Sequence, residues 1–472
     1  MSADRRPFYV SRVSVPYSSC RLTGRNIHSH TICLWCRVVE SAPVRQVSRE
    51  GIRKISGMKI ESVERIWVDL PLKEVPWRNM VREIPHWSLF ELCKVTLSNG
   101  VVGVGETMPY YTWGAVTDEA VERVDGQHPA AVMWDDSLGA GLQMALFDAV
   151  GKSLDTPVWA LLGQKVRSFA HIGWWAIDMP VEDWICECTE AIEHGYTTFK
   201  SKARPWFDLE DQVARLSAAV PNYFKLDMDF NDFGLDPAIA RPLCKRLERF
   251  EKIAIWESPI AQEDVEGNRA LRHHLSVPIA HHIDRPAFET QIRRDICDGF
   301  VMEGGISHAL GRGRTCAEFN KPFWLQWVGS NLAATYCLHI QATLSHARWP
   351  AIHCNHMYAD QFIDEPWVVS NGLSAIPDEP GIGVTVNWDT VEKYRVEAMD
   401  KPYPYPGLLL RLDWPSGTKS WFTHAQQLWD AFSSGDLPAF VTGVNLTRVD
   451  DDGSADWSRL YEQACVSPVH EP

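Results

Sequence analysis

The sequence has no apolar run close to the roughly 18 residues that a membrane-spanning helix needs. It is also short of positive charge, since 46 lysines and arginines stand against 61 aspartates and glutamates, for a net charge of −15. This balance argues against nucleic acid or an anionic membrane as a partner. The twelve cysteines are scattered rather than set at the spacings of a disulfide framework, which favours a reducing compartment. We therefore expect a cytoplasmic protein.

Apolar residues make up 45% of the 472 positions, enough for a large core, and the length predicts two or three domains. Residues 1–57 differ from the rest, because they are basic, rich in serine and without a sustained period. They fit either an organelle-targeting peptide or an extension upstream of the natural start. We favour a basic, disordered extension, since Met58 opens a segment that alternates like a strand.

Residues 58–167 carry mixed strand and helix signals. The turn Ser98-Asn99-Gly100 joins two alternating runs at 92–97 and 101–105, which is a strong hairpin signal. Farther on, one apolar helix face recurs at i, i+3, i+4, i+7 and i+8, formed by Leu142, Ala145, Leu146, Ala149 and Val150. The segment is predicted to be an α+β domain.

Short apolar runs then recur every 20–30 residues or so, with helical patterns between them. The runs are His171–Trp175, Tyr196–Lys202, Phe224–Asp229, Ile253–Glu257, Pro278–His282, Gly299–Glu303, Phe323–Trp327 and Ala351–Asn355. This alternation predicts an α/β fold, a (β/α)8 TIM barrel over residues 168–380. A doubly wound sheet is the alternative, but no G-x-G-x-x-G motif follows any of the strands.

Lysines and carboxylates end three successive predicted strands, where barrel side chains converge on one pocket. Lys200 and Lys202 share a face of one strand, and two neighbouring ammonium groups lower each other's pKa, so that one could act as a neutral base. Asp229 ends the next strand, with Asn231 on the same face, and Glu257 ends the strand after it. Each residue alone fits a solvated strand end or a helix cap. Together they predict an oxygen-rich cation site that suits Mg²⁺.

The ordered motifs K-x-K, D-x-N and W-E-S-P resemble the enolase superfamily of the mandelate racemase and acid-sugar dehydratase type. Residues 147–152 with 161–163 resemble its junction between cap and barrel, and 380–384 resemble the segment that returns to the cap. The resemblance covers about 58–396. It implies an N-terminal α+β capping domain at 58–167, a return segment at 381–400 and a C-terminal appendage at 401–472 outside the match.

The resemblance also implies roles for single residues. Lys202 would remove the proton α to a carboxylate, with Lys200 tuning it, while Asp229 and Glu257 hold Mg²⁺. Asn231 would contact the substrate or the water shell of the metal. Further candidate substrate contacts are Asn355 and Trp327. In the cap, Trp87 and the loop at 109–114 are candidate specificity elements.

The fifth predicted strand departs from the family pattern. A glutamate is expected as the third metal ligand, but its position holds Ile283, flanked by His282 and Asp284. Either neighbour completes the metal shell, or His282 is a general acid. An imidazole ligand would favour Mn²⁺ or another divalent ion over Mg²⁺. The seventh strand lacks the histidine of the racemases, while Glu303 on the sixth takes the place of their dyad aspartate.

The sequence therefore predicts a lyase, a hydro-lyase that dehydrates a hydroxy or sugar acid. The substrate would be a small-molecule carboxylate, and the family analogy implies a homo-oligomer. Two alternatives stay open. One is racemisation or epimerisation at the same carbon, with His282 or a histidine of the eighth strand as partner base. The other is a degenerate barrel that only binds ligands or serves as a scaffold.

Overall fold

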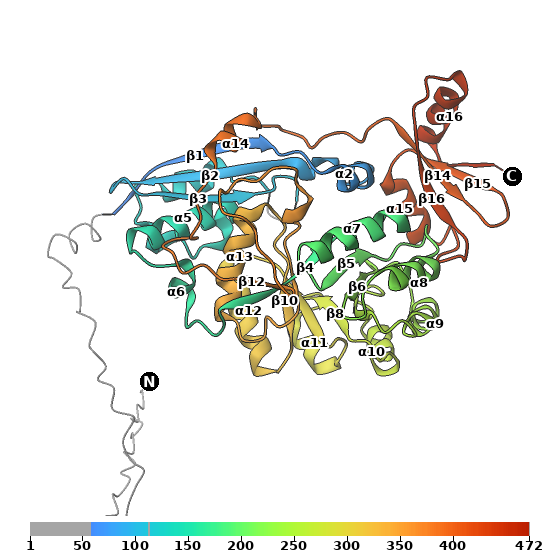
Figure 1. Cartoon of the computed structure of the whole chain (residues 1–472), viewed down its shortest axis with the longest axis horizontal. Helices are drawn as coiled ribbons and strands as arrows, with labels where there is room; N and C mark the ends of the chain where they lie inside the picture. The colour runs from blue at the N-terminus through green and yellow to red at the C-terminus, as the bar shows by residue number, and fades with distance from the viewer. Residues whose placement is uncertain (1–57, 112–113, 472) are drawn as a thin grey trace, which may run out of the picture. The chain divides into compact units, whose positions relative to one another are not determined.

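A computed structural model describes residues 58–111 and 114–471 (Figure 1). The predicted extension 1–57 lies outside the described residues, as do 112–113 and 472. None of the described helices combines the length and apolar character needed to span a bilayer.

The segment that follows Met58 forms an antiparallel sheet, here called the cap together with its helices. Its strands are β1 (Ile60–Asp69), β2 (Leu89–Leu97), β3 (Val102–Thr107) and β13 (Arg395–Val396), in the order β13-β1-β2-β3. Its helices are α2 (Glu74–Met80), α3 (Asp118–Val124), α4 (Pro129–Val132), α5 (Ala140–Ser153) and α6 (Val158–Leu162), with the 3₁₀ turns η1 (Pro85–Ser88) and η2 (Asp136–Leu138). The predicted hairpin is β2–β3.

Helix α5 lies directly against β3 because the strand offers glycine where the helix crosses. A Cβ atom on Gly103 would stand 2.1 Å from the carbonyl oxygen of Ala145. In the same helix, Asp148 accepts bonds from the backbone N–H groups of Val104 (2.9 Å) and Ile382 (2.9 Å). One buried carboxylate thus joins the cap sheet to the segment that returns from the barrel.

Eight parallel strands form the barrel, in the order β10-β9-β8-β7-β6-β5-β4-β11. They are β4 (Phe169–Trp175), β5 (Thr198–Lys202), β6 (Lys225–Asp229), β7 (Ile253–Glu257), β8 (Ile279–His282), β9 (Gly299–Met302), β10 (Phe323–Leu325) and β11 (Ala351–Ile352). A parallel bridge from Gln326 to Ile352 joins the two ends of the sheet. The short strand β12 (Leu373–Ala375) pairs with β4 from outside this path. The predicted barrel is confirmed.

Helices cover the barrel between the strands. They are α7 (Val181–Glu193), α8 (Leu209–Ala219), α9 (Pro237–Leu247), α10 (Val265–His274), α11 (Phe288–Arg294), α12 (Ile306–Glu318) and α13 (Asn331–Thr343), followed by the turn η3 (Asn355–Met357) and α14 (Trp388–Lys393). Sequence signals fix several ends. Asp236 caps α9 by accepting from the N–H of Ala238 (2.6 Å), with Pro237 as the first helical residue.

Residues 408–471, here called the C-terminal unit, form a second antiparallel sheet (Figure 1). Its strands are β14 (Leu408–Asp413), β15 (Lys419–Phe422), β16 (Asn445–Asp450) and β17 (Val469–Glu471), in the order β16-β14-β15-β17, with helices α15 (Ala425–Ser433) and α16 (Ala455–Val466). Its core includes Phe432 and extends to Val81 of the cap and Trp206 of the barrel. This unit therefore packs against both other parts.

Candidate active site

A cavity of about 420 Å³ opens at the carboxyl ends of the barrel strands. The barrel, the cap and the C-terminal unit all contribute to its wall. Its lining includes Glu83, Ile84, His86, Trp87, Tyr110, Tyr111, Trp175, Ile177, Lys202, Arg204, Asp229, Asn231, His282, Arg285, Glu303, Gln326, Val328, Ile352 and Trp429. The size is within the range of small-molecule sites, and the mixture of charged and aromatic groups suits a polar ligand.

Lys202 ends β5 and faces this cavity. Its ammonium donates to the carboxylate of Asp229 (2.5 Å) and to the side-chain oxygen of Asn231 (2.9 Å). The backbone register pairs Lys202 with Asp229 on the neighbouring strand, so the contact follows from the sheet itself. These three polar groups lie together, as the alternation along the strands predicted.

Lys200 lies two residues earlier and is only 1% exposed. Its Nζ lies 2.6 Å from Glu257, 3.7 Å from Asp229 and 2.7 Å from the side-chain oxygen of Gln326. Burial alone would lower the pKa of Lys200, but the two carboxylates outweigh it and raise this pKa above its ordinary value. The expectation of a lowered pKa is therefore wrong for Lys200, because its nearest charged partners are anions.

Asp229 and Glu257 stand side by side at the ends of β6 and β7, paired in register and each 1% exposed. Burial raises the pKa of Asp229, but the ammonium groups of Lys202 and Lys200 outweigh it and hold this pKa well below its usual range. Neither carboxylate oxygen of Glu257 accepts a well-directed hydrogen bond from the described residues. Buried anionic oxygens of this kind are suited to a divalent cation.

The fit to a metal ion rests on two carboxylates. Within 58–111 and 114–471, no group of three or more histidine, cysteine, aspartate or glutamate side chains is arranged to hold a metal. Asp229 and Glu257 would therefore need water, substrate oxygens or His282 to complete a coordination shell. At the expected glutamate position, Ile283 is 5% exposed and packs in the core.

His282 ends β8 between two carboxylates. Its Nε2 lies 3.3 Å from Glu257 and its Nδ1 lies 3.5 Å from Glu303. Burial would lower the pKa of His282, but these carboxylates outweigh it and raise this pKa to about 9. Its neighbour His281 lies in the core, 3.0 Å from the side-chain oxygen of Asn268. The structure therefore places His282, and not His281, in the cavity.

Besides Lys200 and Glu257, which are each 1% exposed, three further predicted site residues are absent from the lining of the cavity. Asp284 has a left-handed backbone (φ 65°) and forms an ion pair with Arg312 (2.8 Å), so it is not placed as a metal ligand. The indole of Trp327 donates to the carbonyl of Gly304 (3.0 Å). Asn355 donates to the side chain of Asn331 (2.7 Å) and is 3% exposed. Trp327 and Asn355 therefore do not line the cavity in this structure, and their contacts with a substrate stay predictions.

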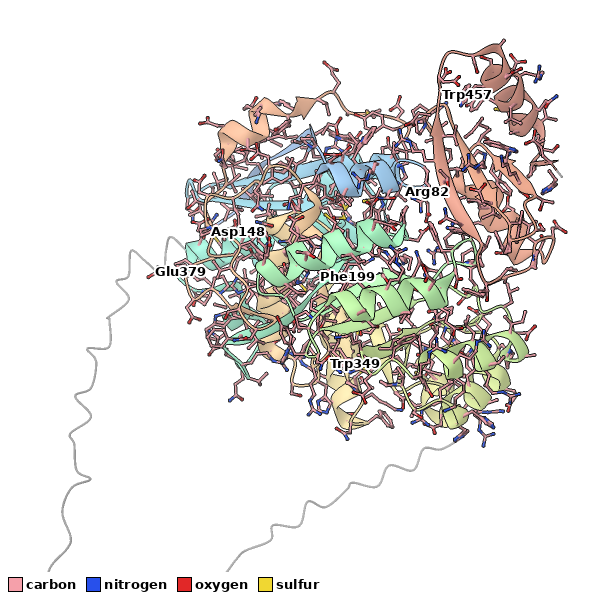
Figure 2. All side chains as sticks on the ribbon, turned by 45° about the vertical axis from the view of Figure 1, so that its right-hand side comes forward. Arg82, Asp148, Phe199, Trp349, Glu379 and Trp457 are labelled. Atoms are coloured by element: carbon pink, nitrogen blue, oxygen red, sulfur yellow. The ribbon has the colours of Figure 1, made fainter. Side chains whose placement is uncertain are left out.

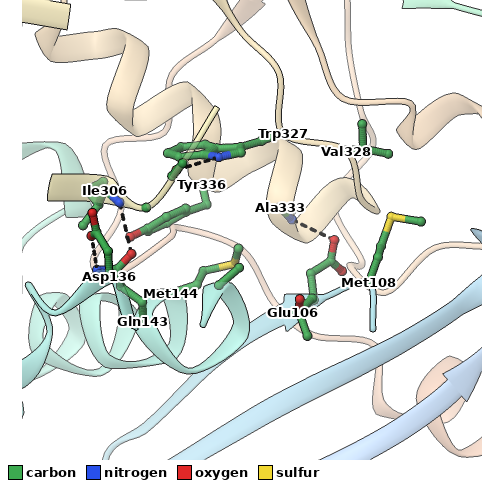
Figure 3. Close-up of a pocket in the computed structure, with 14 residues that line it drawn as sticks. Glu106, Met108, Asp136, Gln143, Met144, Ile306, Trp327, Val328, Ala333 and Tyr336 are labelled. Carbon is green, nitrogen blue, oxygen red and sulfur yellow. Dashed lines mark hydrogen bonds between the residues drawn. The ribbon is translucent and has the colours of Figure 1, made fainter. Parts of the chain in front are cut away.

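Trp327 instead lines a separate, small cavity of about 30 Å³ between α5 and the barrel helices (Figure 3). Glu106 of the cap lies there and accepts from the backbone N–H groups of Ser330 (2.6 Å) and Ala333 (3.3 Å). Burial raises the pKa of Glu106 to about 7. None of the clustered lysines and carboxylates of the larger cavity reaches this place, so we interpret it as a joint between cap and barrel.

Sequence reasoning missed several groups in the larger cavity. Gln326 and Arg204 follow the ends of β10 and β5, and the strand alternation that marked Lys202 also marks Arg204. Glu83 and His86 come from the cap and Trp429 from the C-terminal unit, and no local signal ties them to barrel strands. The cap residues Trp87, Tyr110 and Tyr111 do line the cavity, while 112–113 lie outside the described residues.

Comparison with known proteins bears on the family and the fold. Residues 184–390 match the family model described as enolase C-terminal domain-like. The barrel of this protein thus resembles that of the enolase superfamily over these residues. Proteins of this superfamily generally use a divalent metal ion.

Curated relatives match over most of their length. An arabinonate dehydratase of Saccharolobus solfataricus is 25% identical over 344 residues, which is 65% of this chain and 90% of that protein. A D-galactonate dehydratase of Cronobacter sakazakii is 29% identical over 354 residues, with the same shares of 65% and 90%. A muconate cycloisomerase of Acinetobacter lwoffii is 25% identical over 376 residues, which is 72% of this chain and 96% of that protein.

Solved structures of related enzymes share this fold. Muconate lactonizing enzyme from Pseudomonas fluorescens, in a structure with muconolactone, superposes with a TM-score of 0.62 at 21% identity. The match covers 72% of this chain and 100% of that enzyme. The predicted family resemblance and fold are thus confirmed, and the predicted hydro-lyase class agrees with the dehydratases among the relatives.

Proposed function

We propose that this enolase-superfamily protein dehydrates a hydroxylated carboxylic acid of the sugar-acid type, with Mg²⁺ as its metal. The observation that carries the proposal is that Lys202 on β5 and His282 on β8 line one cavity, with β6 and β7 and their buried pair Asp229 and Glu257 between them. Dehydration needs one group that takes a proton and one that gives a proton. The dehydratases among the relatives make this reaction the first candidate.

Each residue has a defined task in this reaction. Lys202, as the amine, removes the proton from the carbon next to the carboxylate, and Asn231 holds the amine through its side-chain oxygen. His282 gives a proton to the hydroxyl that leaves from the next carbon, so that water departs and an enol forms. The enol then becomes the keto acid. Asp229 and Glu257 would hold the metal, which when bound stabilises negative charge on the substrate carboxylate.

Glu303 acts as a positioning residue for His282. Its carboxylate lies 3.5 Å from Nδ1, which leaves Nε2 toward Glu257 and the metal position. A carboxylate on one ring nitrogen fixes the orientation of the ring and its protonated form. The pair supports a second candidate as well, because an acid–base group opposite Lys202 is what a racemase or epimerase needs.

The test is a screen of sugar acids and other hydroxy acids with Mg²⁺ in D₂O. Dehydration releases a keto acid, whereas racemisation exchanges the α proton and yields only a stereoisomer. We expect keto acid from the parent and a loss of at least about 10³-fold in Lys202→Met. Lys225→Met is the matched control, because Lys225 begins β6 and its ammonium donates to the carbonyl of Glu251 (2.9 Å).

Several outcomes would reject the proposal. Exchange without keto acid would favour the racemase. A parent that turns over no acid and exchanges no α proton would favour a binding or scaffold role. Equal loss in Lys202→Met and Lys225→Met would point to general damage rather than to the loss of a base.

A further inference from the structure

The C-terminal unit contributes to the wall of the candidate active site. Trp429 of α15 lines the cavity together with Lys202 and Asp229 of the barrel. The family match ends at residue 390, and the solved muconate lactonizing enzyme matches only 72% of this chain at its full length. The unit that carries Trp429 thus begins after the end of the family match.

The unit is fixed to the rest of the protein by backbone bonds. The N–H of Ala425, which begins α15, donates to the carbonyl of Arg82 in the cap (3.1 Å). On the barrel side, the N–H of Asp208 donates to the carbonyl of Val444 (2.9 Å), and its carboxylate accepts from the N–H of Gly443 (2.7 Å). Figure 2 shows Arg82 between the cap and this unit. These bonds hold the C-terminal unit in place as part of the cavity wall.

Trp429 covers a buried cation. The guanidinium carbon of Arg204 lies 4.8 Å from the centre of the Trp429 ring, and Phe233 packs against the ring at 4.7 Å. Arg204 is 1% exposed and donates to the side-chain oxygen of Asn231 (2.9 Å), which also accepts from Lys202. A continuous set of contacts thus links the C-terminal unit to the proposed base.

Two donors at this wall lack an acceptor. Neither Nε1 of Trp429 nor Nε of Arg204 donates a hydrogen bond to any described residue, although both atoms are buried. Asp178, the nearest carboxylate to Arg204, lies 3.7 Å away from that nitrogen. The Oδ1 atom of Asp178 also lacks a hydrogen-bond partner and is the acceptor that Arg204 Nε faces. Buried donors are rarely left without a partner, so Nε1 of Trp429 is the donor at this wall that suits a ligand oxygen.

We propose that Trp429 is a specificity-determining residue, whose ring limits the length of the acid substrate. The cavity wall at Trp429 binds a hydroxyl or carboxylate oxygen at the end of the substrate remote from the reacting carbon. The inference rests on the proposed function for the identity of the substrate as a hydroxy acid. It assigns to the C-terminal unit the selection of chain length.

The experiment compares the full-length parent with Trp429→Ala, Trp429→Phe and the control Trp457→Ala. Trp457 lies on α16 of the same unit, stacked on Tyr461 (4.9 Å) and away from the barrel (Figure 2). Binding of aldonic and aldaric acids of increasing chain length is measured by calorimetry with Mg²⁺, and kcat and KM follow for every acid that reacts. Circular dichroism checks the fold of each variant.

We expect Trp429→Ala to shift the preference toward longer acids, with KM for the parent's best acid raised about tenfold or more and kcat changed much less. Trp429→Phe keeps the ring and should keep the length preference, while affinity falls about fivefold from the lost N–H. Trp457→Ala should match the parent. An unchanged length profile in Trp429→Ala, or the same shift in Trp457→Ala, would overturn the inference.

The design separates this inference from the proposed function. A parent that binds acids without turning them over would refute dehydration, while the binding profiles would still support or reject the role of Trp429. A parent that binds none of the acids would refute both.

Discussion

Replacing Lys200 by methionine should destabilise the protein strongly, in a way that depends on divalent metal. The side chain is 1% exposed and lies between Glu257 at 2.6 Å and Asp229 at 3.7 Å. Its removal leaves Glu257 with His282, at 3.3 Å, as a more distant cationic partner, and breaking a buried ion pair costs about 3–5 kcal/mol. Methionine has a similar length, so the loss of charge dominates the loss of packing.

Urea unfolding of Lys200→Met and the parent, each with chelator and with excess Mg²⁺, measures this effect. We expect the full loss of about 3–5 kcal/mol in chelator. Metal at a hundredfold excess over its Kd adds about 2.7 kcal/mol to a protein that binds it, and should offset much of the loss.

Lys202→Met is the matched control for this prediction. Lys202 is more exposed, with 16% of its side chain accessible, and its partner Asp229 keeps Lys200 as a second cation. Its loss should therefore cost clearly less. A loss below about 1 kcal/mol in Lys200→Met, or equal losses in both variants, would refute the reasoning about buried charge.

Three further predictions concern the folded state. Asp178→Asn removes the buried carboxylate that pairs with Arg82 and should lower the free energy of unfolding by about 3–5 kcal/mol, measured in urea. Gly103→Ala forces a Cβ to within 2.1 Å of a backbone oxygen and should cost about 3 kcal/mol by the same assay. Burial lowers the pKa of His339 to about 4 and of His356 to about 3. Both histidines are therefore neutral in the folded protein, and the free energy of unfolding falls as the pH drops below the unfolded pKa of about 6.5. Urea midpoints measured at about pH 7 and about pH 5 would show this fall. His356→Gln should make the difference between the two midpoints smaller.

The sequence predicted the barrel well because each strand is a short apolar run that ends in a polar residue. The predicted strand 253–257 coincides with β7, and Lys202, Asp229 and His282 end β5, β6 and β8 as expected from their patterns. Within a strand, side chains alternate by geometry, so residues two apart share a face.

Trp327, Asn355 and Asp284 lie beyond the ends of their strands and do not line the cavity. β10 ends at Leu325 and β11 at Ile352, so Trp327 and Asn355 follow loop geometry instead. Asp284 comes two residues after the end of β8, in a left-handed conformation that turns it toward Arg312. Alternation alone does not decide such positions, since Arg204, also two residues past its strand, does line the cavity.

Other residues of the cavity could not be predicted from the sequence for a different reason. Glu83 comes from the cap and Trp429 from the C-terminal unit, and their approach to Lys202 depends on how three parts of the chain pack. Neither residue belongs to a motif or to a periodic pattern that points at the barrel. Only the tertiary structure brings them to the site.

The pairing of β13 with β1 has a consequence for synthesis on the ribosome. Trp67 of β1 pairs with Val396 of β13. One edge of β1 therefore stays uncovered during synthesis until β13, more than 300 residues later, has been made. Trp429 emerges later still. A nascent chain released before β13 would carry an exposed strand edge and an open cavity, both of which favour aggregation or capture by chaperones. Premature termination between β11 and β13 should therefore produce a chain that is removed by quality control, even though its barrel strands are complete.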